Sequence, residues 1–267
     1  MEAFINGINL HYEDHGHGLP VILLHGFPLN HEIWRPQIEA LQNECRVITP
    51  DLRGHGKSEA PGEVYPMAGL ADDIAGLIKH LNCGPAIIAG HSMGGYGAFA
   101  FYRRYADLVK GLVLVSTRAA ADTPEGKANR EAMAQRAERE RSSAVAVEKM
   151  LPNMMSPASL AADPSLKTKV DAMVAATSFH GIAGAQRGMA SRSDSSDLLP
   201  TISVPTLIIA GTADALIPPV ESQNMAQAIH GAELQLLDGA GHLPSLEKPH
   251  EFTAALQHWL RQQFAQP

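Results

Sequence analysis

The stretch PAIIAGHSMGGYGAF, from Pro85 to Phe99, contains an apolar run, a serine between glycines and a helix-like run, in that order. Ser92 stands at the turn from a predicted buried strand to a predicted helix, at the centre of Gly-His-Ser-Met-Gly. A turn this tight strains its central residue, and glycine at positions 90 and 94 avoids a collision. We therefore predict that the Ser92 hydroxyl is held clear of the sheet, at the positive end of a helix, as a candidate nucleophile.

Five other apolar runs share the character of the run before Ser92, because they are short, rich in β-branched residues and bounded by proline or glycine. Such runs are typical of parallel strands buried on both faces. They alternate with helical patterns, clearest at residues 69–81 and 251–264, so we predict an α/β fold around a mostly parallel sheet. In chain order the predicted strands are 20–26, 45–51, 85–91, 111–117, 205–211 and 233–239.

The N-terminal residues AFINGINLHYED alternate in polarity around Asn6-Gly7. Asn-Gly favours the type I′ turn of a tight hairpin, because both residues tolerate a positive φ. An antiparallel pair of strands is therefore expected where the sequence opens.

Residues 118–199, the helical insertion, interrupt the strand and helix alternation. We predict two parts: a core of residues 1–117 and 200–267, and a helical cap of residues 118–199 that covers the site. The alternative is a charged helical surface that does not touch a ligand. The mixed charges of residues 129–141 indicate a solvated helix face. Four prolines are expected to mark helix boundaries in this segment: Pro124, Pro152, Pro157 and Pro164. Six methionines are expected either to line a pocket or to pack the cap against the core: Met133, Met150, Met154, Met155, Met173 and Met189.

A serine hydroxyl needs a base within hydrogen-bond reach, and that base needs a carboxylate to orient it. Asp214 follows one predicted strand and His242 follows the next, both on the loops where parallel strands end. The order Ser92, Asp214, His242 is the order expected of a triad that converges from separate strands. Asp238, four residues before His242, is the alternative carboxylate.

Acyl transfer also requires donors for the oxyanion. The N–H groups of Phe27, in the loop after a predicted strand, and of Met93, next to the nucleophile, are the candidates. Pro28 restricts Phe27 and fixes its own φ, so the loop is expected to be stiff. A carbonyl held in this loop would accept a hydrogen bond from hydrogen peroxide, which raises perhydrolase side activity as a hypothesis beside plain loop rigidity.

Composition limits the function classes. With 267 residues, 45% of them hydrophobic, and a net charge of −7, the chain can bury a full core and lacks the basic surface expected of a nucleic-acid or anionic-membrane partner. The two cysteines cannot form a disulfide framework, and the first residues lack the pattern of a leader, so we expect a cytoplasmic protein. No cofactor is expected: GHGKS lacks the first glycine of a phosphate-binding loop, and a polar loop explains His11, His15 and His17 without a metal.

Five spaced segments resemble those of the α/β-hydrolase family and cover nearly the whole chain: His25-Gly26, DLRGHGKS, GHSMGG, GTADALIPP and GAGHLPSLEKP. The resemblance implies an eight-stranded, mostly parallel sheet with a helical cap, and a triad of Ser92, Asp214 and His242. Within the family, the chain is similar to capped carboxylesterases, to 3-oxoadipate enol-lactonase-like enzymes and to C–C-bond hydrolases. Serine at position 92 sets it apart from haloalkane dehalogenases and epoxide hydrolases, which use aspartate there.

We therefore expect a serine esterase that cleaves small to medium carboxylic esters through an acyl-enzyme on Ser92. Two alternatives stay open: a lactone hydrolase that uses the same groups on a cyclic ester, and a ligand-sensing protein that keeps the triad but turns over slowly. The expected partner is a small-molecule ester or lactone.

Overall fold

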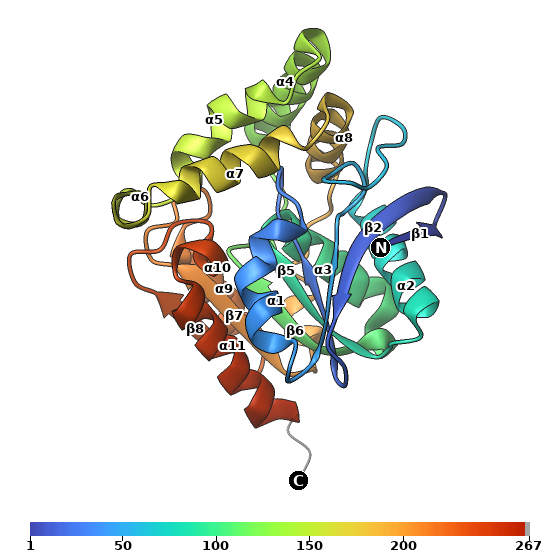
Figure 1. Cartoon of the computed structure of the whole chain (residues 1–267), viewed down its shortest axis with the longest axis vertical. Helices are drawn as coiled ribbons and strands as arrows, with labels where there is room; N and C mark the ends of the chain where they lie inside the picture. The colour runs from blue at the N-terminus through green and yellow to red at the C-terminus, as the bar shows by residue number, and fades with distance from the viewer. Residues whose placement is uncertain (265–267) are drawn as a thin grey trace.

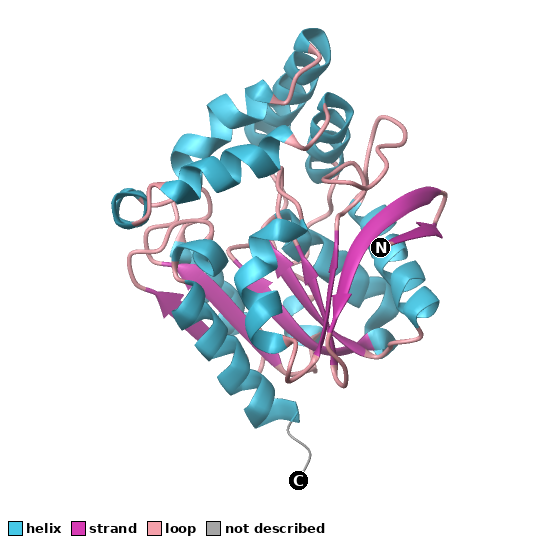
Figure 2. Cartoon of the chain, in the orientation of Figure 1, coloured by secondary structure: helices cyan, strands magenta, loops and turns pink. Residues whose placement is uncertain are grey.

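Strand β5 (Ala86–His91), which leads to Ser92, lies inside an eight-stranded sheet of the order β1-β2-β4-β3-β5-β6-β7-β8 (Figures 1 and 2). The computed structural model describes residues 1–264. From β4 to β8 every neighbouring pair is parallel, and β2 pairs antiparallel with both β1 and β4. The predicted mostly parallel α/β sheet is confirmed. The other strands are β1 (Glu2–Ile5), β2 (Ile8–His15), β3 (Pro20–Leu24), β4 (Arg46–Pro50), β6 (Val109–Val115), β7 (Thr206–Gly211) and β8 (Glu233–Leu237).

The opening hairpin forms at the predicted turn. Asn6 and Gly7 have φ values of 49° and 82°, and Ile5 pairs with Ile8 across them. Both residues thus have the positive φ that a type I′ turn requires.

The central strands are buried on both faces, as their continuous apolar sequences predict. Ile22, Ile88 and Val113 are each 0% exposed. Strand β8 lies at an edge of the sheet, and most of its residues are partly exposed. The predicted strands overlap the observed ones with shifts of one or two residues, which is the usual uncertainty of strand ends.

Helices cover both faces of the sheet. Helix α2 (Met67–Leu81) packs on α3 (Met93–Tyr105), and α11 (Pro249–Phe264) packs on α1 (Arg35–Leu41), in front of the sheet in Figure 1. The predicted helices at 69–81 and 251–264 are confirmed, and each begins two residues earlier than expected. Helices α1, α9 (Pro219–Ala228) and α10 (Pro244–Glu247) have too few turns for their periodicity to stand out, and sequence analysis missed them.

The helical insertion lies between β6 and β7, above the carboxyl ends of the parallel strands (Figure 1). Helix α4 packs along α8, and α5 along α7. Pro124 and Pro157 start helices, and Pro164 immediately precedes one, as predicted. Pro152 lies inside the last turn of α5, two residues before its end, so the prediction that it marks a helix boundary is wrong. The helices of the insertion are α4 (Pro124–Glu140), α5 (Ala144–Met154), α6 (Pro157–Ala162), α7 (Ser165–Ala175) and α8 (Phe179–Ala190).

Cys45 and Cys83 are both buried free thiols. Burial raises the pKa of the Cys45 thiol to about 11, because a thiolate loses its hydration in the core. No helix within residues 1–264 is both long enough and apolar enough to cross a membrane.

Candidate active site

Ser92 occupies a sharp turn between β5 and α3. Its backbone has φ 51° and ψ −111°, outside the regions that non-glycine residues favour. Two hydrogen bonds hold this strained backbone conformation. The Ser92 N–H donates to the carbonyl of Val115 at 2.9 Å, and the Thr117 hydroxyl donates to the Ser92 carbonyl at 2.9 Å. A Cβ on Gly90 would lie 2.3 Å from the carbonyl oxygen of Gly94, so this turn excludes a side chain at position 90.

His242 and Asp214 come together from the loops after β8 and β7. The Nδ1 atom of His242 lies 2.8 Å from Oδ2 of Asp214, and the two residues are only 1% and 5% exposed. Burial alone would raise the pKa of Asp214, but the nearby His242 and the N–H groups of Leu216 and Ile217 hold it below its usual value. An ionised Asp214 keeps the proton of the imidazole on Nδ1 and leaves Nε2 free to accept one.

Asp238, the alternative carboxylate, has a different partner. The hydroxyl of Thr212 donates to Asp238 Oδ1 at 3.2 Å, at an exposed position, and no described contact joins Asp238 to His242. The two aspartates are thus distinguished by geometry that their spacing in the sequence does not show.

A cavity of about 130 Å³ contains both Ser92 and His242. Phe27 lines the same cavity, and Met93 begins α3, where a backbone N–H has no carbonyl of a preceding turn to bond. The structure thus brings Ser92, His242 and the Phe27 loop to one cavity, with Asp214 behind the histidine. The cavity is lined by Phe27, Ser92, Tyr96, Arg118, Arg130, Met150, Met189, Leu216, Ile217 and His242.

His91, the last residue of β5, contacts the loop that carries His242. Its Nε2 lies 2.7 Å from the carbonyl oxygen of His242, and the two rings are 4.8 Å apart. Burial lowers the pKa of His91 to about 3, so its imidazole is neutral and its Nε2–H donates to that carbonyl. Because His91 directly precedes Ser92, this bond ties the two loops together.

The family model for the alpha/beta hydrolase fold matches residues 20–249. The chain belongs to the α/β-hydrolase family. It is 34% identical over 250 residues to an AB hydrolase superfamily protein, YisY, of Bacillus subtilis, covering 88% of this chain and 89% of the relative.

Two solved structures resemble the hydrolase closely. One is a thermophilic esterase from Thermogutta terrifontis with malate bound, at a TM-score of 0.95 and 43% identity over 98% of both chains. The other is the enol-lactonase from Burkholderia xenovorans LB400, at a TM-score of 0.90 and 30% identity over 97% of this chain and 99% of that one. These similarities support hydrolase activity within an esterase and enol-lactonase-like branch.

Three arginines of the hydrolase surround Asp122, whose side chain is 2% exposed. Arg118 Nη2 lies 2.6 Å from Asp122 Oδ1, Arg192 Nη1 lies 2.8 Å from Oδ2, and Arg130 also pairs with Oδ2. Burial alone would raise the pKa of Asp122, but Arg192 and Arg130 hold it far below its usual value. Three guanidinium groups thus meet at one carboxylate, and two further anions lie near them: Glu221 near Arg118 and Asp194 near Arg192.

Arg130 corrects one sequence-based interpretation. Residues 129–141 were expected to be a solvated helix face, and Arg136 on this helix does pair with Glu140 in solvent. Arg130, however, lines the cavity beside Ser92. Sequence analysis missed it because the mixed-charge pattern of α4 gives no sign of which arginine points inward. Arg118 was also missed, although it lies just past the carboxyl end of β6, an edge where ligands bind in parallel sheets.

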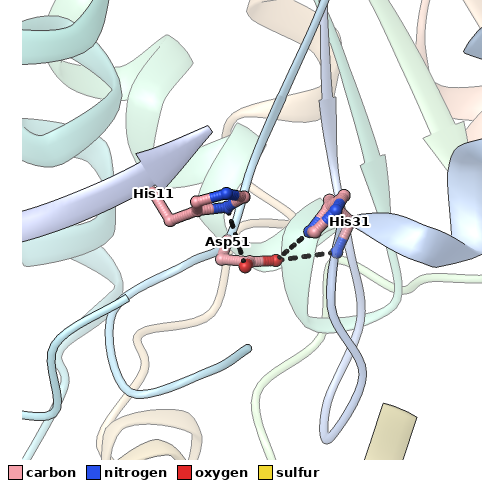
Figure 3. A group of neighbouring side chains, drawn as sticks. All are labelled: His11, His31 and Asp51. Carbon is pink, nitrogen blue, oxygen red and sulfur yellow. Dashed lines mark hydrogen bonds and ion pairs between the residues drawn. The ribbon is translucent and has the colours of Figure 1, made fainter. Parts of the chain in front are cut away.

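His11, His31 and Asp51 point toward one another and place possible metal ligands within 4.8 Å (Figure 3). Asp51, which is 0% exposed, accepts the backbone N–H groups of His31 and Lys57 as well as the His31 ring, at 2.7–2.9 Å. The hydrogen bond and charge of Asp51 raise the pKa of His31 even though burial lowers it, which favours an imidazolium paired with Asp51. Protein donors thus already fill this carboxylate, and the residues do not fit a metal ion.

A neighbouring set, Glu13, His31 and Glu32, also brings ligand atoms together. Arg35 donates to both glutamates, at 2.8–3.2 Å, and so occupies the position of a cation there. His11 and His15 lie in strand β2, so the expected polar loop is wrong for them, and His15 pairs there with Glu13. The neighbouring Asp14 pairs with Arg46. These contacts make the surroundings of Asp51 a network of ion pairs.

Proposed function

We propose that this hydrolase cleaves carboxylic esters through an acyl-enzyme on Ser92. The observation that carries the proposal is the shared cavity: the strained Ser92 and the Asp214-paired His242 both line it. A serine hydroxyl becomes an effective nucleophile only beside an oriented base, and these three residues supply that set.

In the proposed reaction, Ser92 Oγ attacks the ester carbonyl while His242 Nε2 takes its proton. The carbonyl oxygen becomes an oxyanion, held by the N–H groups of Phe27 and Met93. When the tetrahedral intermediate collapses, the bond to the alkoxy oxygen breaks and His242 gives its proton to the leaving alcohol. Water then attacks the acyl-enzyme in the same way and releases the acid, while Asp214 stabilises the imidazolium in both steps.

The cavity supports a preference for small acyl groups. Its volume of about 130 Å³ lies below the range of typical drug-sized sites, and Met150 and Met189 of the helical insertion form part of its wall. We propose on this basis that residues 118–199 act as a cap over the core formed by residues 1–117 and 200–267. Met154 and Met155 support the packing alternative, since they are 0% and 4% exposed and do not line the cavity.

The test is pre-steady-state hydrolysis of p-nitrophenyl acetate, followed by the intact mass of the quenched protein. We expect a burst of p-nitrophenolate, a mass increase of one acetyl group on Ser92, and steady turnover. A burst without turnover would favour the ligand-sensing alternative. Turnover without any adduct, undiminished in Ser92→Ala, would rule out the proposed nucleophile.

A second candidate is a lactone or ester that carries a carboxylate, and an unpartnered arginine donor beside the cavity favours it. Arg118 and Arg130 line the cavity, and Nε of Arg118 is buried without a hydrogen-bond partner among the described residues. A substrate carboxylate there would accept a hydrogen bond from this donor. We expect Arg118→Gln to raise KM for a monoester of a dicarboxylic acid by about tenfold or more and to leave KM for the neutral ester unchanged. Equal KM changes for both esters would remove this candidate.

Perhydrolase side activity stays a prediction. The Pro28 carbonyl accepts the hydroxyl of Thr177 at 3.0 Å, and the Gly26 carbonyl accepts the N–H of Leu29 at 2.9 Å, so both have protein partners. The test is the ratio of peracid to acid formed from an acetate ester in peroxide. If Pro28→Leu leaves that ratio unchanged, the proline has only a rigidifying role.

A further inference from the structure

Glu247, the last residue of α10, accepts three backbone hydrogen bonds at once. Its Oε2 accepts the N–H groups of Gly241 and Ser156, and its Oε1 accepts the N–H of Leu243, each at 2.9 Å. Gly241 and Leu243 are the two neighbours of His242. One carboxylate therefore holds the backbone on both sides of the proposed base.

The third donor, Ser156, belongs to the helical insertion, at the start of α6. A second bond joins the same segments, since the N–H of His242 donates to the carbonyl of Met154 at 3.0 Å. The backbones also touch, because a Cβ on Gly241 would lie only 2.6 Å from the nitrogen of Ser156. Residues 154–156 and the His242 loop are thus packed directly on each other.

The loop that carries His242 lies between β8 and α10, outside the hydrogen-bonding pattern of a strand or helix. Hydrogen bonds that N–H groups donate to a charged acceptor are stronger than those between neutral groups. No lysine, arginine or histidine within residues 1–264 forms an ion pair with Glu247. Its charge is therefore directed at these three N–H groups. Asp214 orients the imidazole ring, whereas Glu247 holds the backbone that carries it.

We propose that Glu247 is a positioning residue that fastens the helical insertion to His242. This inference rests on the proposed function, in which His242 is the base. Its consequence is that the insertion sets more than the shape of the cavity: displacement of residues 154–156 moves the proposed base away from Ser92. A proton transfer is sensitive to such displacement, because the donor and acceptor must stay within hydrogen-bond reach.

The first experiment compares Glu247→Gln with Glu251→Gln, a matched control on α11 whose side chain is exposed and 3.7 Å from Lys248. Glutamine keeps the size of the side chain, but it replaces one acceptor oxygen by an NH₂ group that faces N–H donors. We expect kcat for p-nitrophenyl acetate to fall by about 10- to 100-fold with KM unchanged, and the control to match wild type. The rate at which diethyl p-nitrophenyl phosphate modifies Ser92 should fall by the same factor, because that step uses the same base.

Stability is measured on the same variants, and the assay temperature is kept well below each Tm. A lower Tm with kcat and the modification rate unchanged would show that Glu247 only stabilises the fold, and would overturn the proposal. Failure of the proposed function looks different: wild-type protein would then show no modification of Ser92.

The second experiment isolates the bond to the helical insertion. Ser156 has φ −71° and ψ 148°, which proline can adopt, and Ser156→Pro removes the N–H that Glu247 accepts. Ser156→Ala is the control, because it keeps this N–H and loses the hydroxyl that caps α6. We expect the proline variant to lower kcat at unchanged KM and the alanine variant not to. Equal kcat values in the two variants would show that the bond from Ser156 does not position His242. If Ser156→Pro lowers kcat just as much in the Glu247→Gln background, its effect does not act through the Glu247 carboxylate.

Discussion

Nδ1 of His242 lies 2.8 Å from Asp214 Oδ2, although 27 residues separate them in the chain. Asp238, only four residues from His242, contacts Thr212 instead. The carboxylate that pairs with His242 therefore comes from the neighbouring strand end, and we expect substitutions of the two aspartates to have different effects.

We expect Asp214→Asn to lower kcat by about 10⁴-fold, because an amide cannot stabilise the imidazolium and favours the wrong tautomer. Asp238→Asn should change kcat by less than about threefold, since that side chain is exposed and only supports a turn. Steady-state kinetics on one neutral ester measures both. The reverse ranking would transfer the carboxylate role to Asp238.

Ser92→Ala and His242→Ala should each abolish most of the turnover, and the double variant should be no worse than either single one. Residues that act as one unit lose their whole contribution when any member is removed. The measurement is kcat/KM for the three variants, with circular dichroism to show that they are folded. Additive losses would mean that the two residues contribute independently.

Acyl-chain selectivity should follow the cavity wall. Met189, which is 2% exposed, lines the cavity with Ser92. Met189→Ala should raise the ratio of kcat/KM for hexanoate to that for acetate esters by about tenfold, because a removed clash is worth about one to a few kcal/mol. Met173→Ala is the control, since Met173 lines a separate groove beside Lys169 and Leu246. If the wild type hydrolysed long-chain triglycerides faster than acetate esters, the proposed preference for small acyl groups would be wrong.

Stability should fall as the pH falls below about 6.5. Burial lowers the pKa of His25 and His91 to about 3 and that of His55 to about 4, whereas the unfolded value is about 6.5. Between these values the unfolded chain binds the protons and the folded protein does not, so acid favours unfolding. Each such histidine contributes a slope of up to about 1.4 kcal/mol per pH unit.

His31 acts in the opposite direction, because its raised pKa favours the folded state at acid pH and loses that contribution as the pH rises. Urea unfolding at pH 7, 6 and 5 measures how the free energy of unfolding changes with pH. His55→Gln should reduce the number of protons bound on unfolding by about one. A free energy of unfolding that stays constant from pH 6.5 to 4.5 would contradict the assignment of these histidines as neutral.

Asp122→Asn should destabilise the fold strongly. Three arginines would lose their common carboxylate, and breaking a buried ion pair from one side costs about 3–5 kcal/mol. Asp197→Asn is the matched control, because Asp197 pairs with Arg103 at 2.7 Å on the surface and should leave stability nearly unchanged. Urea denaturation measures both, and similar midpoints would show that the arginine cluster is solvated.

The sequence by itself determined the features that depend on neighbouring residues. The strands follow from short apolar runs, the hairpin from Asn6-Gly7, and the turn at Ser92 from glycines two positions to either side, because backbone sterics and periodicity act within a few residues. The placement of Ser92, Asp214 and His242 at strand ends followed from the alternation of strands and helices, since parallel strands end at one edge.

Only the tertiary structure decided the contacts between segments. It placed Asp214 rather than Asp238 against His242, turned Arg130 of a highly charged helix into the cavity, and joined Glu247 to Ser156 of the helical insertion. Each contact joins residues on different elements, and helix packing and loop paths set their separation. Those are properties of the whole packed chain, because burial and charge pairing are balanced over all elements at once and no local pattern records which partner a side chain will meet.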